Sequence, residues 1–210
     1  MKVVPAILTD DRQAFKDMLE TAEAFAEHIQ VDIMDGRFVP SKSITIEDLK
    51  DIKCRRFTEA HLMVEDPLLW IDAFKETGVK RIIFHFEIDR DKSAVISRIR
   101  KEGLSVGIAV NPDTPISEIF SLSDKTDMVL FMSVIPGFYG AEFIPEVLNK
   151  AREFKKLLPG KPVGIDGGIK PGNFQQAVSS GIDFICVGSA IFRAEDPASA
   201  YKNLSSLLIK

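Results

Sequence analysis

Eight short apolar runs recur along the chain, and longer stretches with apolar residues three or four positions apart lie between them. The short runs, such as "RIIFHF", "VGIAV", "MVLFM" and "FICVG", are rich in β-branched and aromatic side chains. Nearly continuous apolar runs are typical of strands that are covered on both faces, so they predict a parallel sheet. The predicted strands span residues 2–8, 28–34, 57–63, 81–86, 105–110, 128–133, 162–165 and 183–188.

The stretches between these strands have the spacing of amphipathic helices. In the first stretch an apolar stripe recurs at helical intervals, from Phe15 to Phe25. Pro67 and Pro145 lie near the starts of two stretches, and Gly78, Gly103 and a Pro-Gly pair end three of them, which matches helix start and stop signals. Helices are therefore predicted within residues 11–28, 65–78, 91–103, 144–160, 170–181 and 195–210.

A strand followed by a helix or a shorter helical segment repeats about every 26 residues along the 210-residue chain. This alternation predicts an α/β protein, in which residues 1–210 form a single closed (β/α)8 TIM barrel. The competing open, doubly wound sheet needs a glycine-rich turn after its first strand, where the sequence reads "PAILTDD". The glycine-rich turns follow the seventh and eighth strands instead, where this kind of barrel binds phosphate.

Composition removes several other classes of protein. The net charge of −4, with 45% hydrophobic residues, argues against disorder and against a nucleic-acid binder that works by bulk charge. Two cysteines are too few for a disulfide scaffold. Since no apolar run approaches 18 residues and no signal peptide is recognisable, we expect a globular, cytoplasmic protein that binds neither membranes nor nucleic acid.

Acidic and imidazole side chains occur where the predicted strands end, which is where such barrels carry their chemistry. Gln30 and Asp32 are two residues apart, so they point to the same side of their strand. An aspartate within an apolar run is costly unless it is paired, so Asp32 is either one half of a structural ion pair or a functional group. Taken alone, Asp166 would be interpreted as a turn residue and His61 as a core histidine. The combination of Asp32, Asp166 and His61 at strand ends favours an active site. Other polar residues near the strand ends are Thr9, Asp10, Asp35, Glu59, His85, Glu87, Asn111 and Ser133.

Two glycine-containing segments, "IDGGI" and "VGSAIF", each lie between a strand and a helix start. Glycine allows backbone N–H groups to approach an anion closely, so the pair predicts a phosphate site. The segment "PGFYG" after the sixth strand is interpreted either as a mobile lid or as an ordinary tight turn. Three methionines, Met34, Met63 and Met132, fall near strand ends and either belong to the core or line the reaction site.

Several of these segments, in the same order along the chain, resemble the ribulose-phosphate 3-epimerase family. They are "PAILTDD", "QVDIMDGRFVPS", "AHLMVEDP", "AVNPDTP", "MSVIPGFYGAEFIPEVLNK", "GIDGGIKPGN" and "VGSAIF". The resemblance covers nearly the whole chain. It implies a barrel of the ribulose-phosphate-binding type, an isomerase that interconverts D-ribulose 5-phosphate and D-xylulose 5-phosphate, and one divalent zinc, iron or manganese ion as cofactor.

The resemblance also assigns roles residue by residue. Asp32 and Asp166 match the two aspartates that transfer protons on opposite faces of the substrate and bind the metal, and His61 matches a metal-binding histidine that also contacts substrate. Thr9 stands where the family usually has a substrate-contacting serine. Further substrate-binding positions implied in this way are Met34, Met63, Met132, Gly137, Phe138, Tyr139, Gly140, Gly167, Gly168, Gly188 and Ser189.

Three departures from the family pattern affect the expected site. Gln30 occupies the place of the first metal-binding histidine, and its amide oxygen suits a hard cation better than zinc or iron. Ile135 replaces an asparagine, and Tyr139 replaces a small residue in the segment after the sixth strand. Two alternatives therefore remain beside the epimerase reading: a paralogue that acts on a different ketose phosphate with weakened or absent metal binding, and a non-catalytic sugar-phosphate-binding barrel. In each case we expect a homo-oligomer whose ligand is a small ketose phosphate.

Overall fold

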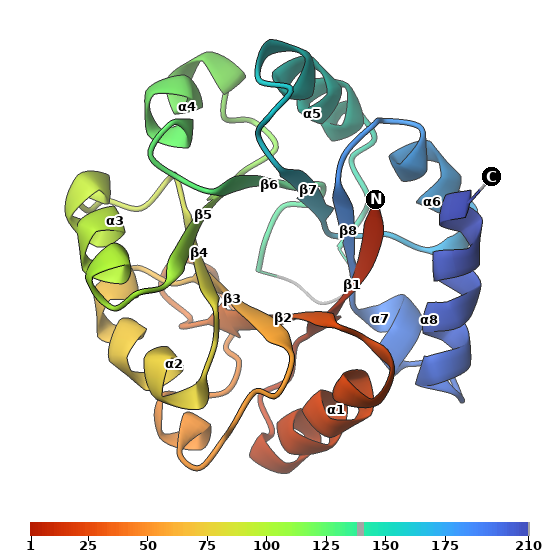
Figure 1. Ribbon diagram of the computed structural model, residues 1–210, viewed down its shortest axis with the longest axis horizontal. Helices are drawn as coiled ribbons and strands as arrows, with labels where there is room; N and C mark the ends of the chain where they lie inside the picture. The colour runs from red at the N-terminus through yellow and green to blue at the C-terminus, as the bar shows by residue number, and fades with distance from the viewer. Residues whose placement is uncertain (138–140, 210) are drawn as a thin grey trace.

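Eight parallel strands form a closed barrel in chain order in the computed structural model, which describes residues 1–137 and 141–209 (Figure 1). Each strand pairs in parallel with the next, and β1 closes the ring by pairing with β8. The predicted barrel is thus confirmed, and the strands agree with prediction to within two residues at each end. They are β1 (Lys2–Ile7), β2 (His28–Met34), β3 (Phe57–Met63), β4 (Arg81–His85), β5 (Ser105–Val110), β6 (Met128–Met132), β7 (Val163–Asp166) and β8 (Phe184–Val187).

Helices surround the barrel on its outer face (Figure 1). The α-helices are α1 (Arg12–Phe25), α2 (Ile71–Thr77), α3 (Lys92–Lys101), α4 (Ile116–Ser123), α5 (Glu146–Leu157), α6 (Pro171–Val178), α7 (Ser189–Phe192) and α8 (Pro197–Ser206). Short 3-10 helices are η1 (Glu47–Leu49), η2 (Pro67–Leu69) and η3 (Leu207–Ile209). The α4 and α7 helices were not among the six long predicted stretches; the four residues of α7 form about one turn, too short for a clear period.

Aspartates at helix starts explain several of the boundaries. The Asp11 carboxylate accepts a hydrogen bond of 2.6 Å from the Ala14 N–H, which satisfies one of the unpaired donors of the first turn of α1. Asp91 and Asp196 cap α3 and α8 in the same way. The α2 helix ends at Gly78, whose φ of 86° is a left-handed conformation that glycine adopts without strain.

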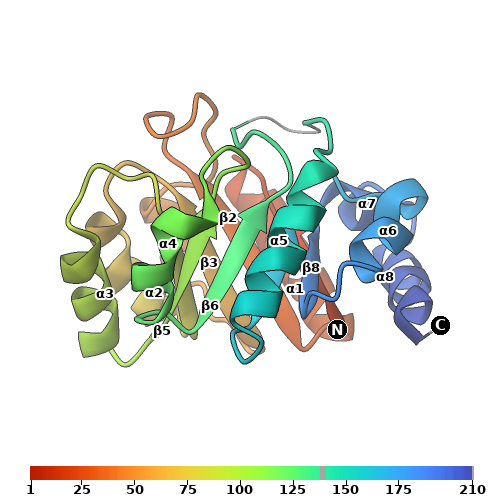
Figure 2. The same ribbon diagram turned by 90° about the horizontal axis from the view of Figure 1, so that it is seen from above.

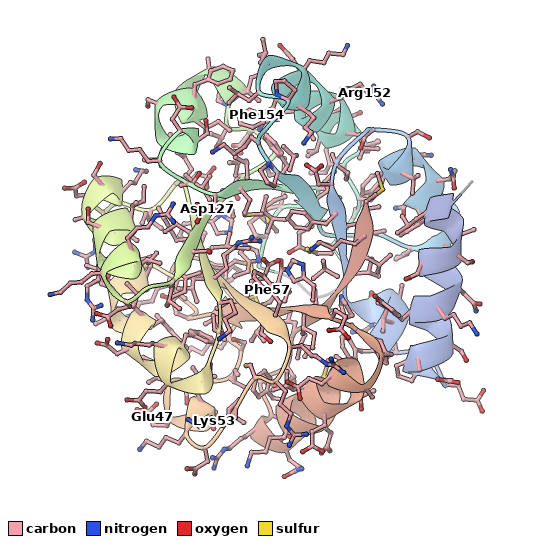
Figure 3. The ribbon with its side chains drawn as sticks, viewed as in Figure 1. Glu47, Lys53, Phe57, Asp127, Arg152 and Phe154 are labelled. Carbon is pink, nitrogen blue, oxygen red and sulfur yellow. The ribbon has the colours of Figure 1, made fainter. Side chains whose placement is uncertain are left out.

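The hydrophobic core has two main parts and a small third cluster of Met34, Val39 and Met63. The larger part lies between strands and helices and contains, among the described residues, six fully buried phenylalanines. Two of them are Phe131 and Phe154, whose ring centroids are 5.5 Å apart; Phe154 is labelled in Figure 3. Burying each such side chain contributes about 1.5–3 kcal/mol to stability. The smaller part fills the inside of the barrel with side chains such as Ile83, Leu130 and Phe184. The barrel interior is therefore packed in its middle, and polar groups gather at its two ends.

The two ends of the barrel are unequal. Figure 2 shows long loops after β2 and β6 on the side where the strands end, opposite the N-terminus. The connections that enter the strands at their N-terminal ends are shorter than these two loops. None of the helices among the described residues is long and apolar enough to cross a membrane.

Candidate active site

A cavity of about 320 Å³ opens at the C-terminal end of the barrel. Its walls come from strand ends and the loops that follow them, as expected for this fold. Eleven of the residues predicted from the sequence line it: Thr9, Asp32, Met34, Met63, Met132, Gly137, Asp166, Gly167, Gly168, Gly188 and Ser189. Phe138, Tyr139 and Gly140 lie outside the described residues.

Asp32, His61 and Asp166 converge at the inner end of this cavity. Asp32 and His61 are register partners on β2 and β3, and Asp166 reaches the same point from β7. The Nδ1 atom of His61 lies 2.9 Å from Asp32 Oδ1 and 3.3 Å from Asp166 Oδ2. His61 is completely buried beneath the two carboxylates rather than lining the cavity. One imidazole nitrogen is thus shared by two acids that the chain brings together from distant strands.

Gln30 lies one layer below and joins the same cluster. Its Nε2 atom donates hydrogen bonds to Asp32 Oδ1 at 2.8 Å and to Asp166 Oδ2 at 2.7 Å. Its Oε1 atom accepts a hydrogen bond of 3.1 Å from the Cys186 thiol, which fixes which way the amide points. Gln30 therefore presents a donor to the carboxylates, because an amide oxygen in that place would face two other acceptors.

The buried carboxylates alter the acidity of the groups around them. Burial raises the pKa of Asp32, and the negative charge of Asp166 raises it further, to about 6, against the opposing hydrogen bonds from His61 and Gln30. Burial alone would lower the pKa of His61, but the hydrogen bonds and charges of Asp166 and Asp32 raise it to about 9. The two carboxylates therefore favour the protonated, positively charged form of His61.

The same three residues have the donor atoms of a divalent-metal site. Their ligand atoms lie within 4.8 Å of one another, and each residue is less than a tenth exposed. Carboxylate oxygens and imidazole nitrogen are ligands for zinc, iron and manganese, and a catalytic metal site needs only three protein ligands. Asp32, His61 and Asp166 fit such an ion, whereas the amide orientation of Gln30 adds no fourth ligand.

The turn that carries Asp166 is held by a buried serine at the end of β6. The Ser133 hydroxyl donates to the carbonyl of Gly167 at 2.7 Å, and the Ser133 N–H donates to the carbonyl of Asp166 at 2.6 Å. Gly168 has a φ of 65°, and a Cβ atom there would lie 2.9 Å from Phe143 Cα. Gly167, with a φ of 111°, and Gly168 are thus both required by the backbone geometry of this turn.

Some residues of the cavity were not identified from the sequence. Lys170 and Arg193 line it next to the two glycine-containing turns and add positive charge there. Their positions directly after "GGI" and "SAIF" were the available signal, but surface cations are too common for that signal to stand out. Ile135, which replaces an asparagine of the family pattern, is 67% exposed and does not line the cavity.

Two acidic residues near predicted strand ends lie elsewhere. Asp35 follows β2, and its carboxylate accepts hydrogen bonds from the backbone N–H groups of Arg37, Phe38 and Glu65, as a loop aspartate does. Glu59 is completely buried near the opposite end of the barrel, where it pairs with Arg81. Strand alternation puts Glu59 and His61 on the same face, but two residues along a strand is enough to place them in different layers.

Comparison with known proteins gives a family match over most of the chain. Residues 2–192 match the model of the ribulose-phosphate 3 epimerase family. The rice protein "Ribulose-phosphate 3-epimerase, cytoplasmic isoform" is 32% identical, over 97% of this chain and 92% of that protein. The ribulose-phosphate 3-epimerase of Aquifex aeolicus is 35% identical, over 99% of this chain and 96% of that protein.

Solved structures of other enzymes share the fold. KGPDC from Streptococcus mutans in complex with D-R5P superposes with a TM-score of 0.77 at 12% identity, over 98% of this chain and 96% of that chain. The 3-hexulose-6-phosphate synthase of Salmonella typhimurium gives a TM-score of 0.71 at 17% identity, over 100% of this chain and 99% of that one. At such low identity these likenesses concern the barrel alone.

Proposed function

The chain belongs to the ribulose-phosphate 3-epimerase family, and from this premise we propose which of its residues carry out the epimerisation. The protein is a carbohydrate-phosphate epimerase that interconverts D-ribulose 5-phosphate and D-xylulose 5-phosphate. The observation that supports the assignment of roles is the pair of buried carboxylates, Asp32 and Asp166, that line one cavity beside two glycine-containing turns.

Epimerisation at C3 requires removal of a proton next to the C2 carbonyl and return of a proton to the opposite face. Asp32 takes the proton from one epimer, and Asp166 delivers one to the other face; the roles exchange in the reverse direction. Without an ion, burial and the charge of Asp166 raise the pKa of Asp32 to about 6. Gln30 donates to both carboxylates and holds them in place while protons move.

Asp32, His61 and Asp166 would hold the divalent ion, for which zinc, iron and manganese are the proposed identities. When bound, this ion supplies positive charge that stabilises the enediolate oxygens. Met34, Met63 and Met132 are nearly fully buried and line the cavity, so they limit the access of water to the reacting carbons.

The phosphate group of the substrate is assigned to the turns after β7 and β8. Gly167, Gly168, Gly188 and Ser189 bring backbone N–H groups to the cavity, and the fold commonly uses these loops for phosphate. Lys170 and Arg193 line the same region and offset the net negative charge of the chain there. Thr9 lines the cavity from the end of β1, and its hydroxyl is assigned to the sugar.

Solvent isotope exchange tests the two-aspartate assignment. Wild-type protein in D2O is expected to convert D-ribulose 5-phosphate to D-xylulose 5-phosphate with deuterium at C3, followed by NMR. The Asp32→Asn and Asp166→Asn variants should each lose epimerisation. In each, the remaining aspartate should still exchange the C3 proton of the epimer whose proton faces it. Equal exchange of both epimers by either variant would contradict the assignment of one aspartate to each face.

A panel of pentulose and hexulose phosphates separates the proposed substrate from the alternatives. The proposed function predicts the highest kcat/KM with D-ribulose 5-phosphate. A higher value with another ketose phosphate would indicate the paralogue, and binding without turnover of any of them would indicate the non-catalytic barrel.

Location and assembly complete the proposal. We place the enzyme in the cytoplasm, in line with the rice relative whose name states a cytoplasmic isoform. We also propose a homo-oligomer, which sedimentation of the purified protein tests directly: a monomer at micromolar concentration would contradict it.

A further inference from the structure

We propose that His85 and Glu87 are positioning residues, which set the ring tautomer of His61 so that its Nδ1 electron pair faces the metal site. This inference rests on the proposed function, because it concerns how the same site holds its ion. Both residues come from the C-terminal end of β4, where the sequence shows two polar groups that the proton-transfer scheme leaves without a role.

A line of hydrogen-bonded side chains leads from His61 away from the cavity. His61 Nε2 lies 3.0 Å from His85 Nε2, and His85 Nδ1 lies 3.3 Å from Glu87 Oε2. Both rings are completely buried and their planes differ by only 24°, so the two nitrogens meet close to the ring planes. The ring centroid of Phe38 lies 4.8 Å from that of His85.

Glu87 at the end of this line is held as a carboxylate. Its Oε1 atom accepts hydrogen bonds from the Asn111 N–H at 2.9 Å and from the Thr114 hydroxyl at 2.6 Å. Burial alone would raise the pKa of Glu87, but the hydrogen bonds from His85, Thr114 and Asn111 outweigh it and keep that pKa below its usual value. An ionised carboxylate only accepts hydrogen bonds, so it fixes the direction of the line.

The direction of the hydrogen bonds along this line follows because each contact between two polar atoms holds one hydrogen. Glu87 accepts, so His85 Nδ1 must carry the hydrogen that it donates. In a neutral ring this leaves an electron pair on His85 Nε2, and His61 must therefore donate from its own Nε2. When a cation replaces the proton on His61 Nδ1, that nitrogen has an electron pair for a cation held between it, Asp32 and Asp166, and the hydrogen on Nε2 stays in place.

This arrangement explains why two histidines meet nitrogen to nitrogen in a barrel interior. Metal-binding histidines generally donate their other ring N–H to a partner that fixes the tautomer and ring orientation. Here a second histidine, His85, occupies that place. Glu87, whose side chain is 21% exposed at the edge of the barrel, sets the direction of the hydrogen bond between the two histidines. Lys150 steadies the loop above by donating to the carbonyls of Asn111 and Pro112.

The tautomer of His85 can be read without any metal. The chain has three histidines, so a ¹⁵N–¹H correlation spectrum of histidine-labelled protein contains three ring systems, and contact with Phe38 identifies that of His85. The expected spectrum of metal-free protein shows a protonated Nδ1 and an unprotonated Nε2 for His85. A hydrogen on Nε2 instead would overturn the inference, whatever the activity of the protein.

The effect on the metal site is measured with Mn²⁺ alone, by calorimetric titration. Glu87→Gln keeps the shape of the side chain but allows either direction along the line, because an amide both donates and accepts. The dissociation constant for Mn²⁺ should rise by about 10–100-fold, the range found for residues that orient metal ligands. Glu118→Gln, the same change on the exposed face of α4, is the control and should leave the constant unchanged.

A second variant separates positioning from loss of fold. Thr114→Val removes one hydrogen bond to Glu87 and should weaken Mn²⁺ binding less than Glu87→Gln does, with the thermal unfolding temperature recorded for both. Unchanged Mn²⁺ affinity in a folded Glu87→Gln variant would refute the inference. If wild-type protein binds no Mn²⁺ and has no epimerase activity, the proposed function fails, and the His85 spectrum still decides the tautomer.

Discussion

The barrel interior carries a buried polar cluster at each end, and the two clusters differ in how their charges are balanced. At the N-terminal end Glu59 pairs with Arg81 at 2.8 Å, and the ring of Phe57 covers the guanidinium at 5.1 Å (Figure 3). At the C-terminal end Asp32 and Asp166 share one imidazole and one amide. Both clusters are buried, so burial alone does not distinguish a structural site from an active one.

The two clusters differ in whether they contain a side chain that is always positively charged. An arginine stays protonated under all ordinary conditions, so Arg81 balances the charge of Glu59 without an ion from outside. His28 belongs to the same cluster, with its Nε2 atom 3.0 Å from Glu59 Oε2. Within the described residues Glu59 Oε1 and His28 Nδ1 have no hydrogen-bond partner. The C-terminal cluster has two acids that, among the described residues, bond to an imidazole and an amide and to no lysine or arginine, and it opens into a cavity. An unbalanced charge beside a cavity is why we propose that the cation and the substrate bind at this end.

The largest expected effect comes from neutralising one acid of the C-terminal cluster. Asp166→Asn should lower kcat for epimerisation by about 10²–10⁴-fold, because one face of the substrate loses its acid or base. The thermal unfolding temperature should not fall, since the change removes one of two neighbouring negative charges. A coupled assay for D-xylulose 5-phosphate measures the rate, and full activity in this variant would contradict the two-aspartate assignment.

Removing one charge from the N-terminal cluster should have the opposite effect: the stability of the fold should fall while kcat is retained. Arg81→Met removes the permanent charge beside the buried Glu59 carboxylate and leaves it only the imidazole of His28, at 3.0 Å, among the described residues. The free energy of unfolding, measured by urea denaturation, should fall by about 3–5 kcal/mol. The kcat of the folded fraction should stay near that of the wild type. The double variant Arg81→Met with Glu59→Leu should recover most of the stability, because no unpaired charge remains. A loss below about 1 kcal/mol in the single variant would show that the pair is not structurally important.

Adding an imidazole to the C-terminal cluster tests whether position 30 can supply a ligand to the ion. Gln30→His supplies a further nitrogen ligand and should strengthen Zn²⁺ binding by on the order of tenfold, measured by competition with a chromophoric chelator. Gln30→Leu serves as the control, because it removes the amide bonds to the carboxylates and adds no ligand. Zn²⁺ binding that is equal in the wild type and in Gln30→His would indicate that position 30 faces away from the ion.

The smallest effect concerns the residue that orients the amide. Cys186→Ala removes the hydrogen bond to Gln30 Oε1 and should cost about 0.5–1.5 kcal/mol of stability, with a modest loss of kcat. Cys186→Ser keeps a donor at that place and should retain more activity than the alanine variant. Equal activity in both variants would mean that the thiol only fills space.

Local sequence pattern was sufficient for much of this protein. The eight apolar runs became eight strands, because a strand covered on both faces needs apolar residues throughout its length. The two glycine-containing turns were visible for a similar reason: positive φ at Gly167 and Gly168 restricts the residue type at each position by itself. Asp32 and Asp166 stood out because charged groups are rare within or next to such runs.

Other features depend on residues far apart in the chain. Nothing in strand three distinguishes Glu59 from His61, yet one pairs with Arg81 and the other with Asp32, because the layer each side chain enters depends on the register with neighbouring strands. The role of Lys170 and Arg193 likewise depends on which way the ends of α6 and α7 face. Sequence alone therefore determined the barrel, its strands and the residue types that the chemistry needs, since these follow from local spacing and burial. Only the tertiary structure decided that Gln30 offers its amide nitrogen to two acids, and that His85 and Glu87 stand behind His61, because hydrogen bonds of this kind join atoms that closure of the barrel brings within reach.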